Sequence, residues 1–224
     1  MRFLRGWFGE QKATFYMWLS LDGRVYRKFH NIIIPGRNGT AQIDHLLISP
    51  YGIFIVETKN ISVWIFGDAD KPKWTSVLYG KKFPFQNPLR QTYRQKMVLA
   101  EYLEISPSLI HTIVFFVGDS KFKTKMPENV MKSGVGRYIK RFQSPILSQG
   151  QVDRLAEMLE HNLANSSLTN RQHVKSLRER HGSTANCPKC GSKLVERCVK
   201  SGPRTGSRFL GCSGYPKCSF TKNI

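Results

Sequence analysis

The spacing of apolar and polar positions changes along the chain, and each spacing predicts an element. Apolar residues recur at helical intervals from Trp7 to Leu21, and Val25 to Ile34 favours a strand. Helical spacing returns from Leu89 to Leu103 and again from Gln151 to Leu163. The chain therefore mixes helices and strands from its beginning.

Two alternating runs between Gly36 and Asn60 are typical of half-buried strands, and Ser49-Pro50-Tyr51-Gly52 between them has turn composition. We therefore expect a β-hairpin. Side chains of a strand alternate between its two faces, so Glu57 and Lys59 point the same way at the end of the second strand. Asp44 lies in the first strand, on the face that it shares with apolar residues.

Further strands are predicted at Val63 to Phe66, Trp74 to Tyr79 and Ile110 to Val117. The last is a continuous apolar run, IHTIVFFV, and is expected to be a central strand buried on both faces. A basic loop with Lys121, Lys123 and Lys125 follows it. Together these segments indicate an α/β fold in which helices flank a sheet.

The predicted helix from Leu89 to Leu103 has two faces. We expect one face to pack on the core, with Leu89, Tyr93, Met97, Ala100 and Leu103. The other is polar and basic, with Arg90, Gln91, Arg94 and Gln95.

Positive charge is concentrated near the carboxyl end of the chain. The net charge is +20, and residues 171–224 contribute +10 of it, with 12 Lys and Arg against 2 Asp and Glu. This distribution favours a polyanionic partner and a salt-dependent affinity. Composition also suggests a main domain at residues 1–165, a partly helical linker at 166–185 and a small domain at 186–224.

No apolar run approaches the ~20 residues of a membrane-spanning helix. The first residues, MRFLRGWFGEQK, lack the apolar core of a signal peptide. A cytoplasmic protein that does not bind membranes is expected.

Cys187-Pro-Lys-Cys190 and Cys212-Ser-Gly-Tyr-Pro-Lys-Cys218 are spaced as two pairs of metal ligands. Zn²⁺ takes four thiolates in a closed tetrahedral structural site, and it supplies folding energy to a segment too short for its own core. We predict that these four cysteines bind zinc. Cys198 has no place in this pattern and is expected to be a spare thiol.

The carboxylates of Asp44 and Glu57 would lie side by side if the two strands pair. Adjacent carboxylates repel unless a divalent cation joins them, and a hard oxygen site suits Mg²⁺ or Mn²⁺. Lys59 on the same face would orient a water or neutralise developing charge. This chemistry fits hydrolysis of a phosphodiester bond.

The motifs Gly9-Glu10, Ile43-Asp44-His45, Pro50-Tyr51-Gly52-Ile53, Val56-Glu57-Thr58-Lys59-Asn60 and Asn87-Pro88 to Gln91 resemble the nuclease-related domain family of the PD-(D/E)XK nuclease superfamily. The resemblance implies a restriction-endonuclease-like mixed sheet flanked by helices. It also implies that Glu10, Asp44 and Glu57 bind the catalytic metal, that Lys59 is the catalytic lysine and that Gln91 is an active-site neighbour.

Residues 187–220 are similar to the zinc finger of bacterial type IA topoisomerases, which implies binding of single-stranded DNA. The composition agrees, because aromatic residues alternate with basic ones, and aromatic faces stack bases while cations follow the backbone. The candidate nucleic-acid ligands are Arg204, Arg208, Phe209, Tyr215 and Lys217. Some aromatic residues could instead fill the small core, Phe209 first among them.

Three functions stay open at this point. The first is a metal-dependent DNA nuclease held on its substrate by the zinc finger. The second is an inert nucleic-acid-binding protein with a nuclease-like fold, and the third is a nuclease that acts on RNA. His45 follows Asp44 and faces the opposite side, so it is interpreted as packed or exposed rather than as a ligand. We assign no role to His30 or His111.

Overall fold

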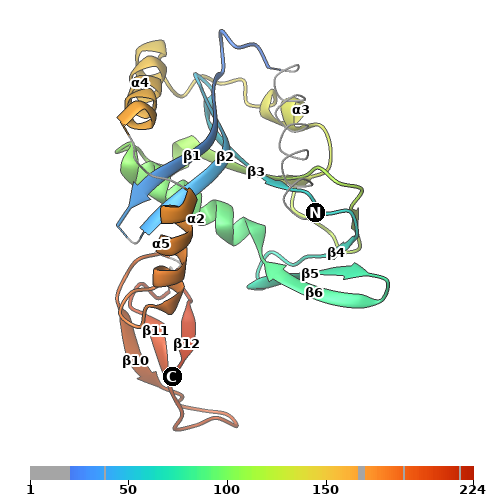
Figure 1. Ribbon diagram of the computed structural model, residues 1–224, viewed down its shortest axis with the longest axis vertical. Coiled ribbons are helices and arrows are strands. Elements are labelled where there is room, and N and C mark those ends of the chain that lie inside the picture. Colours follow the sequence, from blue (N-terminus) through green and yellow to red (C-terminus); the bar gives the residue numbers. More distant parts are fainter. Residues whose placement is uncertain (1–20, 38, 166–169, 189, 217) are drawn as a thin grey trace. The chain divides into compact units, whose positions relative to one another are not determined.

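The computed structural model describes residues 21–37, 39–165, 170–188, 190–216 and 218–224 (Figure 1). The chain divides into two compact units, residues 1–32 with 42–167 and residues 33–41 with 168–224. The helix predicted from Trp7 to Leu21 includes Glu10. Its residues up to number 20 lie outside the part of the chain that the structure describes.

The main sheet has the strand order β1-β2-β3-β7-β9. Its strands are β1 (Arg27–Gly36), β2 (Gly39–Ser49), β3 (Gly52–Lys59), β7 (Ile110–Phe116) and β9 (Val130–Met131). The β2–β3 hairpin is antiparallel, whereas β7 runs parallel to both β3 and β9, so the sheet is mixed. The prediction of a central strand at Ile110 is confirmed.

Both faces of the hairpin are buried, so the expectation of half-buried strands was wrong. On one face Leu47, Phe54 and Val56 pack with residues of the short helix α3 (Val135–Ile139). On the other face, helix α2 (Pro88–Tyr102) packs on β3 and β7. Figure 1 shows α2 running across the strands. The mixed α/β fold is therefore layered, with the sheet between α2 and α3. Asp44, Glu57 and Lys59 alternate with apolar residues along strands of this covered sheet.

The predicted core face of helix α2 is confirmed only in part: Ala100 and Leu103 are buried as expected. Tyr93 and Met97, which were predicted to face the core, are 44% and 38% exposed. Thr92 and Gln95 are buried instead. The physical reason is that the sheet presents a carboxylate to this part of the helix, as described below, and a buried carboxylate requires hydrogen-bond donors.

A second sheet with the order β6-β5-β4-β8 is inserted between β3 and α2, with β8 added later in the chain. Its strands are β4 (Trp64–Phe66), β5 (Lys73–Leu78), β6 (Lys81–Gln86) and β8 (Lys121–Phe122). Strand β6, which contains Pro84, was not predicted from the sequence. Proline is tolerated on an edge strand, which is the position of β6.

Helix α4 (Gln149–Asn165) also belongs to the first unit, as does the one-turn 3-10 helix η1 (Pro107–Leu109). Leu155 and Leu159 of α4 are buried as predicted, but Leu163 is 42% exposed. Arg27 of β1 forms ion pairs with acidic residues of α4, at 2.7 Å from Glu160. Among the described residues, no helix combines the length and apolarity needed to cross a membrane.

The second unit contains helix α5 (Asn170–Gly182) and a small antiparallel sheet of β10 (Leu194–Cys198), β11 (Arg208–Cys212) and β12 (Thr221–Asn223). Helix α5 lies in the stretch that was expected to be partly helical. It packs on residues 33–41, where Thr40 Oγ1 and His173 Nδ1 are 2.6 Å apart and the Thr40 amide donates to Ser176 Oγ.

Candidate active site and zinc site

The register of the hairpin brings Asp44 and Glu57 to equivalent positions. Paired residues run from Ser49 and Gly52 to His45 and Val56, and Asp44 and Glu57 are the next residues along the two strands. Oδ2 of Asp44 accepts a hydrogen bond from the Thr58 amide at 2.8 Å. Strand pairing therefore brings Asp44 and Glu57 to the same level of the hairpin.

Glu57 is the centre of a polar cluster on the face that α2 covers. Its side chain is 3% exposed, and its Oε1 accepts from Lys59 Nζ at 2.6 Å and from Gln91 Nε2 at 2.7 Å. Gln91 Oε1 in turn accepts from Lys59 Nζ at 2.9 Å. The structure thus brings three of the predicted site residues into mutual contact.

Gln95 completes the cluster, although the sequence analysis did not select it. Its Nε2 donates to Glu57 Oε2 at 2.7 Å and to the backbone oxygen of Gln42 at 2.8 Å. The signal was present in the sequence, because Gln95 follows Gln91 by four residues and residues four apart share one face of a helix. Part of the polar face of α2, with Gln91 and Gln95, therefore faces the strand that carries Glu57.

Asn87 fixes the start of α2 and so the position of the glutamines. Its Oδ1 caps the helix by accepting from the Leu89 amide at 2.9 Å. Its Nδ2 donates to three backbone oxygens of the loop before β5, those of Asp68, Ala69 and Lys71. Asn87 is fully buried, so this one side chain ties the inserted sheet to the helix that carries Gln91.

The cluster neutralises a buried charge while keeping acceptor capacity. An ionised carboxylate offers about four acceptor positions, and the hydrogen bonds above use three of those of Glu57. Oε1 of Gln95 is buried and has no hydrogen-bond partner in the described part of the chain. Two carboxylates and a carbonyl oxygen are the hard ligands that Mg²⁺ prefers. The residues present therefore fit a divalent cation.

His45 lies on the opposite face, as expected from its place after Asp44. It is 2% exposed, and its Nδ1 is 2.8 Å from Nδ1 of His30. Burial, and next the charge of His30, lower the pKa of His45 to about 3. The ring is therefore neutral at physiological pH and belongs to the core. His111 also packs among aromatic rings, stacked on Phe54.

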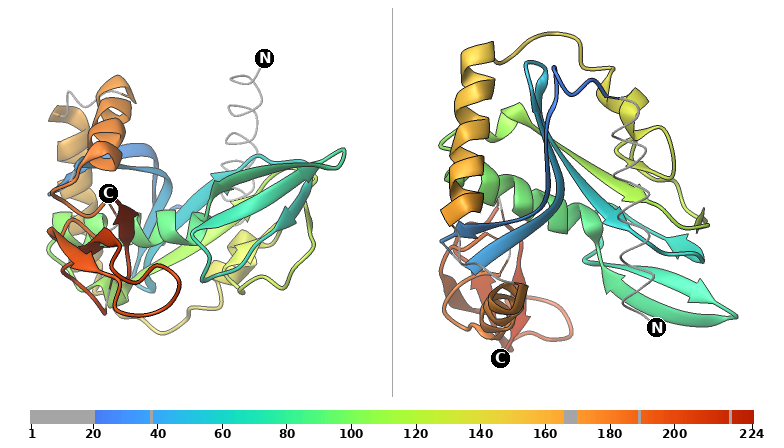
Figure 2. Two further views of the ribbon diagram at one scale, coloured as in Figure 1. Left: turned by 90° about the horizontal axis from the view of Figure 1, so that it is seen from below. Right: turned by 45° about the horizontal axis from the view of Figure 1, so that its top comes forward.

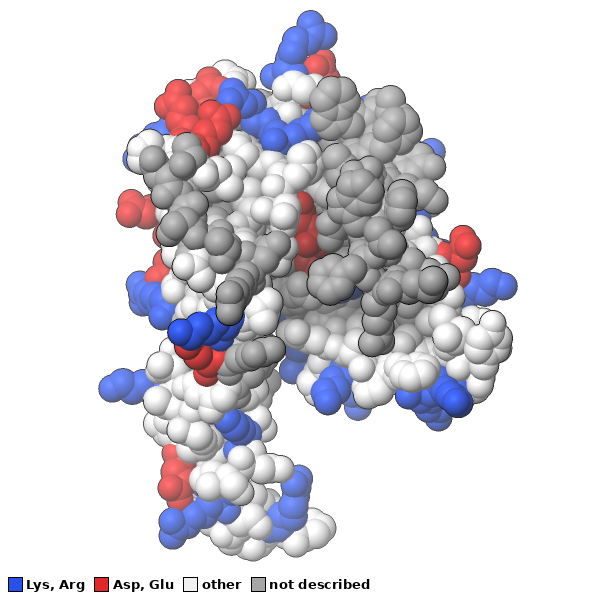
Figure 3. All heavy atoms as spheres, viewed as in Figure 1, with Lys and Arg blue, Asp and Glu red and all other residues white. Residues whose placement is uncertain are grey.

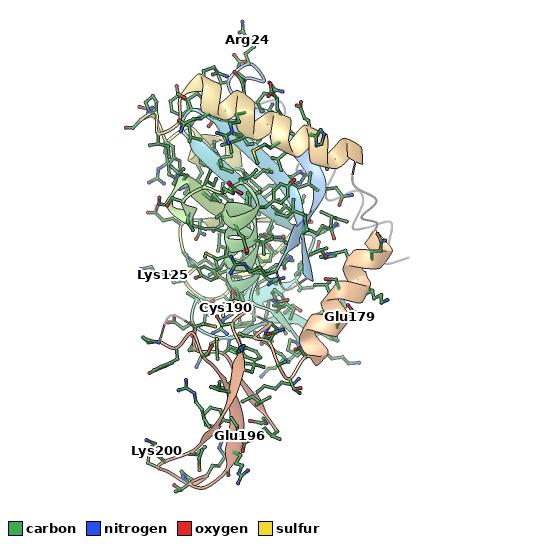
Figure 4. The ribbon with its side chains drawn as sticks, turned by 90° about the vertical axis from the view of Figure 1, so that its left-hand side faces the viewer. Arg24, Lys125, Glu179, Cys190, Glu196 and Lys200 are labelled. Carbon is green, nitrogen blue, oxygen red and sulfur yellow. The ribbon has the colours of Figure 1, made fainter. Side chains whose placement is uncertain are left out.

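The four paired cysteines meet at one end of the small sheet. Their Sγ atoms all lie within 4.8 Å of one another, which fits one tetrahedral zinc ion. Cys198 is exposed on β10 and is not in this group. Figure 4 shows Cys190 at one end of the sheet and Lys200 at the other, with Glu196 between them. Burial raises the pKa of Cys190, but hydrogen bonds with Ser192 and with neighbouring thiols outweigh this effect and lower the pKa to about 7.

The candidate nucleic-acid ligands of this unit differ in their surroundings. Tyr215 is 64% exposed, with the Arg197 guanidinium 5.9 Å from its ring centre. Arg208 is exposed and pairs with Glu196 at 2.9 Å. Arg204 is exposed, Phe209 is half-buried, and Lys217 lies outside the described residues. The suggestion that Phe209 fills the small core was wrong, because Leu210 and Phe220 pack against the cysteines.

Comparisons with known proteins match two segments of the chain to two different family models. Residues 184–224 match the family model described as topoisomerase DNA binding C4 zinc finger. Over 38 residues the chain is 54% identical to DNA topoisomerase 1 of Pyrococcus furiosus, covering 17% of this chain and 3% of that protein. It is 51% identical to the uncharacterized protein YrdD of Escherichia coli over 39 residues, 17% of this chain and 19% of that one.

The chain is also similar to an uncharacterized protein of Bacillus anthracis, with 40% identity over 85 residues. This match covers 38% of the chain and 40% of that relative, so the chain spans less than half the length of the curated proteins cited here. No solved structure matches. Residues 5–117, half of the chain, match the family model described as nuclease-related domain, and they contain the Glu57 cluster. By this match the chain belongs to the nuclease-related domain family.

Proposed function

We propose that the protein is a metal-dependent nuclease that hydrolyses phosphodiester bonds of DNA, with its zinc ribbon binding DNA of single-stranded character. The observation that carries the proposal is the convergence of Lys59, Gln91 and Gln95 on the buried carboxylate of Glu57. A cluster that served only packing would be costly, since apolar residues could fill the same space without desolvating charge.

Asp44 and Glu57, together with Glu10, would hold Mg²⁺ or Mn²⁺. When bound, such a cation would lower the pKa of a coordinated water and place positive charge next to the phosphate. Gln95 fixes Oε2 of Glu57, which limits the carboxylate to one orientation. Gln91 bridges the carboxylate and the ammonium of Lys59, so both charged groups are held in place before substrate arrives.

Lys59 supplies the one cation of the described cluster. Its side chain is 21% exposed, whereas that of Glu57 is 3% exposed, so the ammonium lies toward solvent. From this position Nζ would orient the attacking water or stabilise charge that develops on the phosphate oxygens. Because it donates to two fixed acceptors, the ammonium loses little freedom when it meets the substrate.

The zinc ribbon would keep the substrate at the enzyme. Its match to a DNA-binding zinc finger supports this role, and so does the exposure of Tyr215 next to Arg197. Aromatic faces bind unpaired bases, and exposed cations bind phosphates in a salt-dependent way.

The test compares cleavage of supercoiled plasmid, linear duplex and single-stranded DNA with Mg²⁺ or Mn²⁺. Glu57→Gln and Lys59→Met preserve side-chain size and are expected to lower cleavage at least ~100-fold. Glu128→Gln is the matched control, since Glu128 is exposed and pairs only loosely with Arg141 at 3.4 Å. Equal activity of wild type and both variants would reject the nuclease, and cleavage of RNA alone would reject DNA as the substrate.

A further inference from the structure

The inserted sheet of β4, β5, β6 and β8 has one face that no function described so far uses. Paired residues of neighbouring strands share a face, and the pairs Trp64–Val77, Val77–Lys82 and Trp64–Lys121 place these side chains together. Phe66 and Lys73 lie on the same side by alternation. We call this set, Trp64, Phe66, Lys73, Val77, Lys82 and Lys121, the lysine–aromatic face.

The two faces of the inserted sheet differ in burial next to the main core, whereas Leu78 and Phe83, on the side of Trp74 but farther along the hairpin, are exposed. Ile65 and Trp74, which point to the opposite side, are almost fully buried in the core with Phe116. On the lysine–aromatic face Trp64 is 48% exposed and Phe66 is 40% exposed. Large aromatic side chains on an open sheet face are unfavourable in water, so this exposure marks a surface for a partner.

The charge of the face indicates which partner. The strands of the inserted sheet contain no Asp or Glu. The Nζ of Lys123, just after β8, lies 4.2 Å from the centre of the Trp64 ring. Within the described residues, none of Lys73, Lys82, Lys121 and Lys123 takes part in an ion pair. In Figure 3 the visible surface of β5 and β6, at the lower right, shows blue side chains and no red ones.

The topology connects this face to the Glu57 cluster. The insert leaves the main sheet directly after Lys59 and returns at Asn87, the residue that caps the helix of Gln91. Both views of Figure 2 show β5 and β6 projecting from the rest of the first unit. The parallel pair β3–β7 continues into the parallel pair β4–β8, through a hydrogen bond from the Val117 amide to the Lys59 oxygen. A ligand on the insert therefore lies on an extension of the strands that carry the site.

We propose that the lysine–aromatic face binds one strand of nucleic acid, with unpaired bases stacked on Trp64 and Phe66 and phosphates held by the lysines. Stacking tolerates any base, because every base has an aromatic face, and lysines contact the backbone without reading sequence. A cation already beside the Trp64 ring suits a phosphate next to a stacked base. The identity of this ligand rests on the proposed function, but its binding does not depend on cleavage.

Neighbouring lysines provide a matched test. Lys82 lies on the lysine–aromatic face, whereas Lys81 pairs with Leu78 and points to the other side of the same strand; both are exposed. Binding of a fluorescein-labelled oligo-dT strand to the full chain is measured by anisotropy at several salt concentrations, without added divalent cation. Lys82→Glu and Trp64→Leu are expected to weaken binding about 5-fold or more, and Lys81→Glu less than about 2-fold.

Three outcomes would overturn the proposal. Equal weakening by Lys81→Glu and Lys82→Glu would show a general charge effect, and unchanged binding of Trp64→Leu would exclude stacking. If Lys82→Glu and Trp64→Leu weaken binding of a fluorescein-labelled duplex as much as binding of the oligo-dT strand, a preference of this face for a single strand is excluded. Circular dichroism verifies that each variant is folded. The zinc ribbon is unchanged in all variants, so its contribution to binding is the same in each. If Lys82→Glu and Trp64→Leu bind the oligonucleotide more weakly but the wild-type protein cleaves no nucleic acid, the lysine–aromatic face is supported and the proposed nuclease is rejected.

Discussion

Gln95 of α2 donates to Oε2 of Glu57 over 2.7 Å, and both side chains are 3% exposed. Replacing the glutamine by methionine keeps its size but leaves one carboxylate oxygen buried without that donor. We expect Gln95→Met to lower the free energy of unfolding by about 1–3 kcal/mol. Urea denaturation measures the change. Gln149→Met on α4 is the control, because Gln149 is exposed, and an equal change in both variants would contradict the assignment.

His45 makes the stability of the first unit depend on pH. Its pKa falls from 6.5 to about 3 on folding, so the unfolded chain binds a proton below pH 6.5 that the folded chain does not. Stability is therefore expected to decrease as the pH falls from 6.5 toward 3, by up to roughly 5 kcal/mol for this group. In His45→Leu the free energy of unfolding should fall less steeply between pH 6.5 and pH 3, which urea denaturation at several pH values measures. An unchanged pH dependence in this variant would show that other groups cause the acid sensitivity.

Zinc should be required for the fold of the small sheet. Its core consists of Leu194 with three of the four cysteines, which is too little apolar surface to be stable without a metal. Cys187→Ser is expected to lose the bound zinc and the ordered sheet, while Cys198→Ser keeps one zinc ion per chain. Elemental analysis and circular dichroism measure the two effects. Retention of zinc by Cys187→Ser would show that the four-cysteine site is wrong.

Gly52 allows the turn that pairs β2 with β3. Its φ is +124°, and an added Cβ would lie 3.2 Å from the Leu109 oxygen and from the His111 ring. We expect Gly52→Ala to cost about 1–3 kcal/mol, because this backbone region is strained for other residues. Gly23→Ala is the control, because apart from its chain neighbours no heavy atom of the described residues lies within 4 Å of a Cβ built there. Equal midpoints of thermal unfolding for the two variants would show that the turn tolerates a side chain.

Arg204 tests the electrostatic part of DNA binding by the zinc ribbon. The residue is exposed in the loop between β10 and β11. If it contacts a phosphate, Arg204→Ala should reduce the slope of log affinity against log salt by about 1. Arg24→Ala is the control, since Arg24 is exposed and already paired with Asp22 at 3.2 Å. A slope that is equal to that of the wild type would remove Arg204 from the interface.

The sequence alone determined the features that depend on local pattern. The turn at residues 49–52 and the alternation of the flanking runs predicted the hairpin, and with it the equivalent level of Asp44 and Glu57 in the two strands. The apolar run at Ile110 predicted β7, because a strand buried on both faces cannot alternate. The cysteine spacing predicted the metal cluster, since two short turns bring four thiols together.

Only the tertiary structure decided which face of α2 meets the sheet. Its apolar stripe predicted that Tyr93 and Met97 would be buried, but the buried carboxylate of Glu57 requires donors, and Gln91 and Gln95 supply them. A pattern within one helix contains no information about a charge on a strand more than 30 residues away. The lysine–aromatic face likewise arises from strands that pair across the chain, which no local spacing specifies.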